Sequence, residues 1–397
     1  MRSFLTYAKY LALLGGSIAL TVAQAVTSTA TRPQLSRSDA ANFTIAKYLA
    51  QTGTVGSLTT DNWDPTGGVG VISTFTANYK VTTDGTSPYS TIQAAIDAAV
   101  ASGGGSVRKY ISVQPGIYTG MVCVPASAPP ITLYGLNGVS NNTVIVFGNA
   151  NPMTKTVGVA TNRCAGNASA ATIGTVGSAT ASVLAPNFQA RNLTFKNSYV
   201  EGSVASQNQS AVALAVRGDK AIFENVSIIG NQDTLYIGAT NGTTVMRAYF
   251  KSSFIQGDAD FIFGSGTAVF HGSTIQSTGA RVGAGGTGYV FAPSTQPGNA
   301  YGFLAIGSTF NYTGGATNGS VYLGRAWDQG VSSASGYLND SSPNGQVVIR
   351  DSRLDAHIRL GAPWGTSTSG RPYCSSNCNY SANRFFEYSN TGIGSGN

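Results

Sequence analysis

One short pattern recurs along most of this chain of 397 residues. An apolar residue, a polar residue beside it and a second apolar residue five positions further on form the repeated unit. Copies of this unit occupy residues 188–195, 221–228, 248–255, 268–275, 305–310 and 347–354. Equivalent residues of successive copies, from Ala190 to Ile349, are separated by irregular intervals of 20 to 44 residues. Such intervals are typical of stacked structural units joined by loops of unequal length.

The repeated units are short, strand-like and separated by almost no helical pattern. A parallel β-helix can accommodate such strands. The strands of each coil hydrogen-bond to those of the next coil, and the inward-facing apolar columns form one continuous core. A β-sandwich requires tight hairpins, and a β-propeller requires a steadier repeat. The pattern therefore favours an all-β parallel β-helix over a sandwich or a propeller.

A single helix is expected before the repeats. The run from Ser90 to Gln93 matches a capping box, and apolar residues at positions 92, 95, 96 and 99 share one helical face up to Val100. Glycines at 103–105 would end this helix. We expect it to cap the open first coil of the β-helix and to protect its edge.

The first 25 residues have the organisation of a signal peptide. Arg2 and Lys9 precede an apolar run over 10–22, and a small-x-small pattern follows at 23–25. The apolar run is too short to cross a bilayer, and no later stretch resembles a membrane span. We therefore expect a secreted protein without membrane attachment. The remaining chain is divided into an irregular segment at 26–80, a β-helix domain at 81–360 and a tail at 361–397 that packs on the helix.

Four cysteines are compatible with an oxidising compartment. Cys374 and Cys378 are close enough for a local disulfide, and Cys123 and Cys164 would form a second disulfide across a longer loop. Four cysteines allow three pairings, so the sequence favours this one without establishing it.

Charge and histidine content exclude several kinds of function. The formal net charge of +7 becomes +5 when Arg2 and Lys9 are removed with the signal peptide. The chain has no Lys/Arg run or nucleic-acid-binding motif, so an exported basic protein is expected to meet an acidic polysaccharide instead. Two histidines make a Ser–His–Asp triad or a His-ligated metal improbable. We expect no metal or cofactor, and no feature demands assembly beyond a monomer.

The repeat places two aspartates in one column. Asp233 lies ten residues after Phe223, and Asp260 lies ten residues after Phe250 in the next copy. Coils about 4.8 Å apart would make their carboxylates neighbours. Two close carboxylates push their pKa values apart, which suits a nucleophile and a proton donor. A pair of ordinary turn residues is also possible, because Asp is common where strands bend.

Four motifs in order resemble the pectin methylesterases, whose fold is a right-handed parallel β-helix. The matching runs are 209–214 (QSAVAL), 230–236 (GNQDTLY), 260–264 (DFIFG) and 323–327 (LGRAW), and the resemblance covers about residues 80–360. It implies de-esterification of methylated galacturonan, the main-chain polymer of pectin, to pectate and methanol.

The resemblance also implies a role for each matching residue. Asp260 would attack the ester carbonyl, and Asp233 would protonate the leaving methanol and then activate water. Gln209 and Gln232 would stabilise the oxyanion, and Arg325 would hold Asp260 ionised. The aromatic residues expected to line the substrate groove are Trp327, Phe263, Tyr236 and Tyr118.

The sequence departs from the family pattern at two positions. Gly120 stands where a Glu is usual, and Ala326 stands where a Pro is usual. These departures are typical of a divergent branch, so the substrate could instead be another ester or a thioester. The sequence also leaves open a β-helix enzyme that cleaves polygalacturonate and a non-enzymatic solenoid that binds surfaces.

Overall fold

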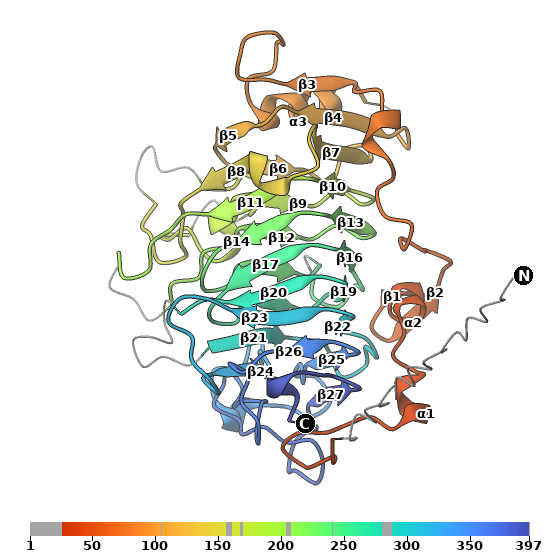
Figure 1. Ribbon diagram of the computed structural model, residues 1–397, viewed down its shortest axis with the longest axis vertical. Helices are drawn as coiled ribbons and strands as arrows, with labels where there is room; N and C mark the ends of the chain where they lie inside the picture. Colours follow the sequence, from red (N-terminus) through yellow and green to blue (C-terminus); the bar gives the residue numbers. More distant parts are fainter. Residues whose placement is uncertain are drawn as a thin grey trace, which may run out of the picture.

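The computed structural model describes residues 26–103, 105–155, 161–166, 170–203, 208–239, 241–279 and 288–396. All but two of its strands form three parallel sheets that wind into a right-handed parallel β-helix (Figure 1). The repeat predicted the parallel β-helix, and the family resemblance implied its hand. The predicted signal peptide lies outside the described residues.

We name the sheets I, II and III. Sheet I contains β3 (Tyr79–Val81), β4 (Lys109–Val113), β7 (Ile131–Gly135), β10 (Gln189–Arg191), β13 (Ala221–Glu224), β16 (Arg247–Lys251), β19 (Thr267–His271), β22 (Phe303–Ile306), β25 (Gln346–Arg350) and β27 (Arg384–Tyr388). Sheet II contains β5 (Gly116–Thr119), β8 (Thr143–Phe147), β11 (Thr194–Asn197), β14 (Ser227–Ile229), β17 (Phe254–Gly257), β20 (Thr274–Ser277), β23 (Thr309–Tyr312) and β26 (Arg353–Leu354). Sheet III contains β6 (Val122–Val124), β9 (Ala181–Val183), β12 (Leu214–Val216), β15 (Leu235–Ile237), β18 (Ile262–Gly264), β21 (Gly288–Pro293) and β24 (Val321–Gly324).

The core follows the columns that the repeat predicted. Phe223 pairs in register with Phe250, which in turn pairs with Phe270, and all three side chains are fully buried. The stacked ring centres lie 4.8 and 5.0 Å apart. In the next two coils the same column continues as Ala305 and Ile349. Identical spacing in successive coils lets each side chain pack on its counterpart, so the core is continuous along the axis.

A repeated geometry turns the chain from sheet I to sheet II. A residue with positive φ stands at this turn in several coils, such as Asn225, Ser252 and Asp351. Asn and Asp adopt this left-handed conformation more readily than most residues. Buried serines follow it, and the backbone N–H of Ser273 donates to Oγ of Ser308 at 3.1 Å. Such serine-to-backbone hydrogen bonds between coils satisfy the buried N–H groups that the turn removes from the sheets.

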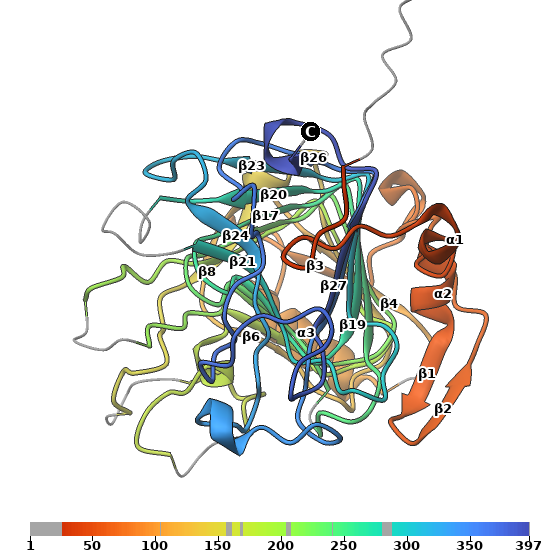
Figure 2. The ribbon, with the colours of Figure 1, turned by 90° about the horizontal axis from the view of Figure 1, so that it is seen from below.

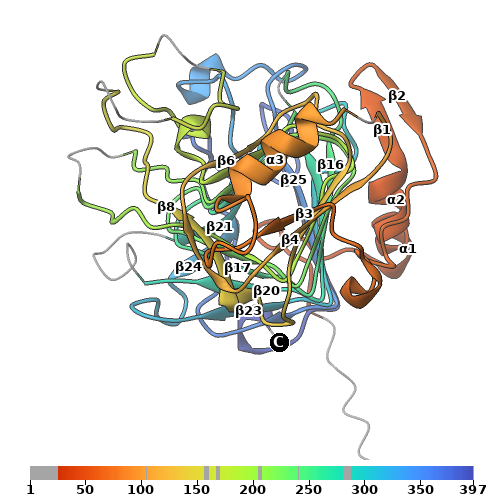
Figure 3. The ribbon, with the colours of Figure 1, turned by 90° about the horizontal axis from the view of Figure 1, so that it is seen from above.

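The expected capping helix is present with a shifted start. Helix α3 (Ile92–Ala101) lies across the first coil (Figure 3) and buries the predicted apolar face. Its N-cap is Thr91, whose side chain accepts from the N–H of Ala94. The predicted capping box assigned that place to Ser90. The Gln93 side chain does not complete a box but hydrogen-bonds both backbone groups of Cys123, which ties the cap to sheet III.

Residues 26–80 were expected to be irregular but contain regular elements. They are α1 (Arg37–Ala40), α2 (Ile45–Ala50), the hairpin β1 (Gln51–Thr54) and β2 (Ser57–Thr60), and the 3₁₀ turn η1 (Ile72–Thr74). Figure 2 shows this segment against the outer face of sheet I, where Tyr48 and Leu49 pack with Tyr249 and Val269. These stretches are too short to show the periodicity that would have predicted such elements.

The C-terminal residues also take part in the β-helix, because β27 pairs with β25 and extends sheet I. Further 3₁₀ turns are η2 (Ser140–Asn142), η3 (Val176–Ser178), η5 (Ala334–Gly336) and η6 (Ile393–Ser395). The favoured pairing of cysteines is confirmed, with disulfides Cys123–Cys164 and Cys374–Cys378. Within the described ranges, no helix is long and apolar enough to cross a membrane.

Candidate functional site

Asp233 and Asp260 occupy the same turn in successive coils, as predicted. Each lies two residues before the start of its strand in sheet III, and Leu235 of β15 pairs with Ile262 of β18. The N–H of Asp233 donates to the carbonyl of Ala259, 3.1 Å away. Both aspartates have positive φ, at 62° and 50°. This conformation ends the preceding segment sharply and places both residues at the edge of the outer face of sheet III.

Arg325 binds the second of these carboxylates through both oxygens. Its Nε donates to Oδ1 of Asp260 at 2.9 Å, and Nη2 donates to Oδ2 at 2.6 Å. Asp260 is 8% exposed. Burial disfavours the charged guanidinium, but the carboxylates of Asp260 and Asp233 outweigh it and raise the pKa of Arg325 above its usual value. A two-pronged charge-assisted pair fixes the orientation of the carboxylate.

The two predicted glutamines are close together but face different surroundings. Oε1 of Gln232 accepts from the backbone N–H of Gln209 at 3.0 Å, so the NH₂ group is the end of that amide that can donate to a substrate. Oε1 of Gln209 accepts from Tyr199 and from the N–H of Gly202. Gln232 lines the cavity beside the aspartates, whereas Gln209 does not. The structure therefore brings Gln232 to the carboxylates and directs the Gln209 oxygen toward the neighbouring loop.

Three of the four predicted aromatic residues line this cavity. Tyr236 and Phe263 lie in one outward column of sheet III, with ring centres 5.2 Å apart, and Trp327 lies 5.7 Å from Phe263. Tyr118 does not line this cavity but a separate one, so its role in the substrate groove stays a prediction. It lies in β5 at the capped end of the β-helix, and its hydroxyl donates to the carbonyl of Gln114.

The cavity has a volume of about 410 Å³. Its lining residues are Thr175, Val176, Asn208, Ser210, Gln232, Asp233, Tyr236, Asp260, Phe263, Ala292, Arg325, Trp327, Gln329 and Thr368. Asn208, Ser210, Gln329 and Thr368 were missed by sequence reasoning. Asn208 and Ser210 flank Gln209, which was itself the residue predicted to face the site, so no periodicity in the sequence pointed to its neighbours.

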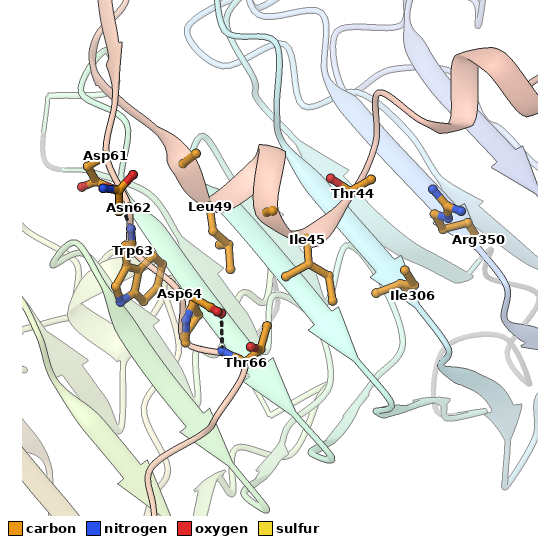
Figure 4. A pocket seen from close by; sticks show the side chains of 13 residues that line it. Thr44, Ile45, Leu49, Asp61, Asn62, Trp63, Asp64, Thr66, Ile306 and Arg350 are labelled. Carbon is orange, nitrogen blue, oxygen red and sulfur yellow. Dashed lines mark hydrogen bonds between the residues drawn. The ribbon is translucent and has the colours of Figure 1, made fainter.

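A larger cavity of about 580 Å³ lies elsewhere, between α2 and the outer face of sheet I (Figure 4). Of its two carboxylates, Asp61 is already paired with Arg247 and Lys220, and Asp64 accepts from the backbone N–H of Thr66. Arg247 also binds Asp219 and the carbonyl of Leu49, so these charges fasten the N-terminal segment to the β-helix. An ion-pair network that joins two parts of a fold accounts for this cluster without chemistry. Across the described residues, no group of three or more His, Cys, Asp or Glu side chains could hold a metal ion.

Comparison with known proteins relates the chain to one family. The Pectinesterase family model matches residues 78–334. A pectinesterase from Ralstonia solanacearum is 70% identical over the full length of both chains. The structure of rice weevil pectin methyl esterase is similar at a TM-score of 0.79, with 36% identity over 93% of this chain and 99% of that one.

Two further relatives bear on the substrate. A pectin methylesterase solved in complex with a hexasaccharide has 30% identity and a TM-score of 0.64, over 81% of this chain and 91% of that one. The Escherichia coli protein YbhC, which is named for acyl-CoA thioester hydrolysis, is 32% identical over 94% of this chain and 90% of its own length.

Proposed function

Because this chain belongs to the Pectinesterase family of carboxylic ester hydrolases, we propose that it de-esterifies pectin through a covalent intermediate on Asp260. The observation that carries the proposal is the pair of stacked aspartates, of which Asp260 is bound through both oxygens by Arg325. An ionised, oriented carboxylate is what a nucleophile requires. A second carboxyl group in the adjacent coil supplies a candidate proton donor.

The proposed reaction has two halves. An oxygen of Asp260 attacks the methyl-ester carbonyl carbon, and the tetrahedral intermediate expels methanol with a proton from Asp233. The resulting acyl-enzyme is an anhydride between Asp260 and the galacturonate. Asp233, now a carboxylate, takes a proton from water as the water attacks the acyl carbon. Asp260 leaves as the carboxylate, so the free acid product and both starting side chains are regenerated.

Gln232 is the proposed donor to the negatively charged oxygen of the intermediate. Its amide oxygen is engaged by the backbone N–H of Gln209, which orients the NH₂ group. A neutral amide stabilises the oxyanion at any pH at which the dyad works, because it does not titrate. Gln209 contributes to this arrangement through its backbone, and its role as a second oxyanion donor, which the family resemblance implies, stays a prediction. Trp327 and Phe263 provide apolar surface for the sugar rings.

The roles of Asp233 and Asp260 can be distinguished by how the activity of each variant depends on the leaving group of the ester. Asp260→Asn should lose both methyl-ester and aryl-ester hydrolysis, because an amide cannot replace the nucleophile. Asp233→Asn should lose methanol release but retain much of the aryl-ester activity, because an aryl alcohol leaves without a proton. Asp351→Asn is the matched control, since Asp351 has the same left-handed turn conformation in another column. Aryl activity that survives in Asp260→Asn and disappears in Asp233→Asn would require the two roles to be exchanged.

The substrate is proposed to be methylated galacturonan rather than a thioester. The support is the family and the hexasaccharide-bound relative, while the likeness to YbhC favours a thioester. Methanol release from pectin without shortening of the polymer would support the proposal. Faster thiol release from an acyl-CoA would contradict it, and a loss of polymer length would indicate a chain-cleaving enzyme.

Secretion is also part of the proposal. The signal-like residues 1–25 and the two disulfides support it. A mature protein in the culture medium that begins near Val26 is the expected result.

A further inference from the structure

We propose that Tyr289 is a positioning residue of this site, whose aromatic ring holds the Arg325 guanidinium in the orientation that binds Asp260. The inference rests on the proposed role of Asp260 as nucleophile. It concerns a residue outside the four sequence motifs and outside the cavity lining.

Tyr289 continues the column of the two aspartates. Ile262 of β18 pairs with Phe291 of β21, and just before this pairing the N–H of Tyr289 donates to the carbonyl of Asp258, so Tyr289 lies one coil on from the turn that carries Asp260. Cζ of Arg325 lies 4.1 Å from the centre of the Tyr289 ring. One guanidinium therefore contacts the ring and donates twice to Asp260.

The ring is itself held on its other face. Tyr289 pairs with Tyr322 in the next coil, and their rings are stacked at 5.0 Å with an angle of 7° between the planes. Arg359 covers Tyr322, with its Cζ 4.4 Å from the ring centre. The result is a stack of Arg325, Tyr289, Tyr322 and Arg359 along the axis of the β-helix.

A glycine makes room for this stack at its edge. A Cβ on Gly365 would lie 2.6 Å from Cε1 of Tyr289 and 3.4 Å from Cδ1 of Tyr322. The backbone at Gly365 therefore limits sideways movement of both rings. The N–H of Tyr289 also donates to the carbonyl of Asp258 at 3.1 Å, which anchors the residue beside the dyad.

This arrangement limits the conformational freedom of the Arg325 side chain. The Arg325 side chain is long and 26% exposed, so it has alternative rotamers that reach solvent. A face-on aromatic ring attracts the cation and restricts it to the plane in which both N–H groups point at Asp260. Because Tyr289 acts through Arg325, its loss should reduce the rate of the chemical step rather than substrate binding.

The test compares kcat and KM on methylated pectin for Tyr289→Leu and Tyr289→Phe. Tyr289→Leu should lower kcat by roughly 3- to 30-fold, the range expected for a lost cation–π contact, with KM changed by less than about 2-fold. Tyr289→Phe retains the ring and should restore kcat to within about 2-fold. Tyr388→Leu is the matched control, because Tyr388 underlies Arg350 in the same way on sheet I. It should leave both constants unchanged.

A second set of variants guards against a folding defect. Gly365→Ala displaces the ring from its edge without altering Tyr289, and it should lower kcat in the same direction. In an Arg325→Lys background, where the stacked fork is already lost, Tyr289→Leu should cause little further loss on an activated aryl ester.

Several outcomes would overturn the inference. They are an unchanged kcat in folded Tyr289→Leu, an equal loss in Tyr289→Phe, or losses that multiply fully in the Arg325→Lys background. If Asp260→Asn is inactive while Tyr289→Leu is fully active, only the role of Tyr289 fails. If Asp260→Asn keeps its activity, the proposed function itself fails.

Discussion

His357 is a buried histidine whose protonation should make the fold sensitive to acid. Its side chain is 0% exposed and its ring is stacked on Tyr312, with centres 4.9 Å apart. Burial lowers the pKa of His357 to about 4, although the nearby Asp355 carboxylate acts in the opposite direction. In the unfolded chain the same imidazole titrates at a pKa of about 6.5.

The sign and size of the effect follow from this difference. The folded state binds the proton less well than the unfolded state, so the contribution of His357 to stability is complete above a pH of about 6.5. It is lost progressively as the pH falls toward about 4. At a pH of about 5 the unfolded chain is protonated at this position and the folded chain is not. The loss at this pH relative to neutrality is about 2 kcal/mol.

His357→Phe removes the titration and retains an aromatic ring for Tyr312. The free energy of unfolding in urea should therefore fall by about 2 kcal/mol less between about pH 7 and about pH 5 in the variant than in the wild type. Any constant cost of the larger ring cancels in this difference. Carboxylates that also titrate in this interval contribute equally to both proteins.

The pKa can be measured directly because the chain has two histidines. His271→Gln leaves His357 as the only imidazole signal in an NMR titration. His271 is partly exposed and hydrogen-bonds Tyr249 on sheet I, far along the chain from His357. An apparent pKa of about 6.5 for His357, or equal pH dependence in His357→Phe and wild type, would refute the reasoning.

Three further predictions concern other parts of the molecule. Gln232→Ala should lower kcat by roughly 10²- to 10³-fold, whereas Gln209→Ala retains the backbone N–H that orients Gln232 and should cost less than about 10-fold. An equal decrease in kcat for both variants in steady-state assays would instead indicate that the Gln209 side chain is an oxyanion donor. Arg247→Met should destabilise the protein by about 3 kcal/mol in urea unfolding, because it leaves Asp61 and Asp219 without their shared cation. Limited proteolysis of this variant should cut first within the segment that precedes β3, and an unchanged cleavage pattern would contradict the fastening role. Apparent affinity for partly de-esterified pectin should fall as salt rises from low to moderate concentration, because the mature charge of +5 is screened beyond about 8 Å at physiological salt. A flat salt profile would show that charge does not guide binding.

The fold was predictable because a β-helix repeats its core at fixed positions within each coil. Phe223, Phe250 and Phe270 align in the sequence and stack in the structure, since no insertion falls within the turn that joins sheets I and II. The same regularity predicted the column of Asp233 and Asp260. The N-terminal segment was not predictable in this way, because α2 is stabilised by packing on sheet I and the β1–β2 hairpin by backbone hydrogen bonds to residues 243–245, rather than by local periodicity.

The positions of site residues could be predicted only where the connections between strands have the same length in successive coils. Ten residues after Phe270 the sequence has Ala280, yet the pairing of β18 with β21 brings Tyr289 beside Asp260. Because the connection before β21 is longer than in the preceding coils, counting residues from Phe270 does not identify Tyr289 as the equivalent position. Tyr118 lies outside the cavity of the dyad, and the family motif identified its strand but not its distance along the axis from the dyad.

The column that begins with the aspartates explains how one geometry can serve two chemical purposes. Stacked coils about 4.8 Å apart place any two successive residues of a column in contact, whatever their chemical type. Two carboxylates at that spacing repel each other. Two aromatic rings at nearly the same spacing attract, as Tyr289 and Tyr322 do at 5.0 Å. Arg325 reaches the boundary between the two types and contacts both, binding Asp260 on one side and Tyr289 on the other. The cation is therefore best held between the coil that carries the carboxylate of Asp260 and the coil that carries the ring of Tyr289. Asp260 differs from Asp233 because its neighbouring coil carries this ring, and not only because Arg325 binds it.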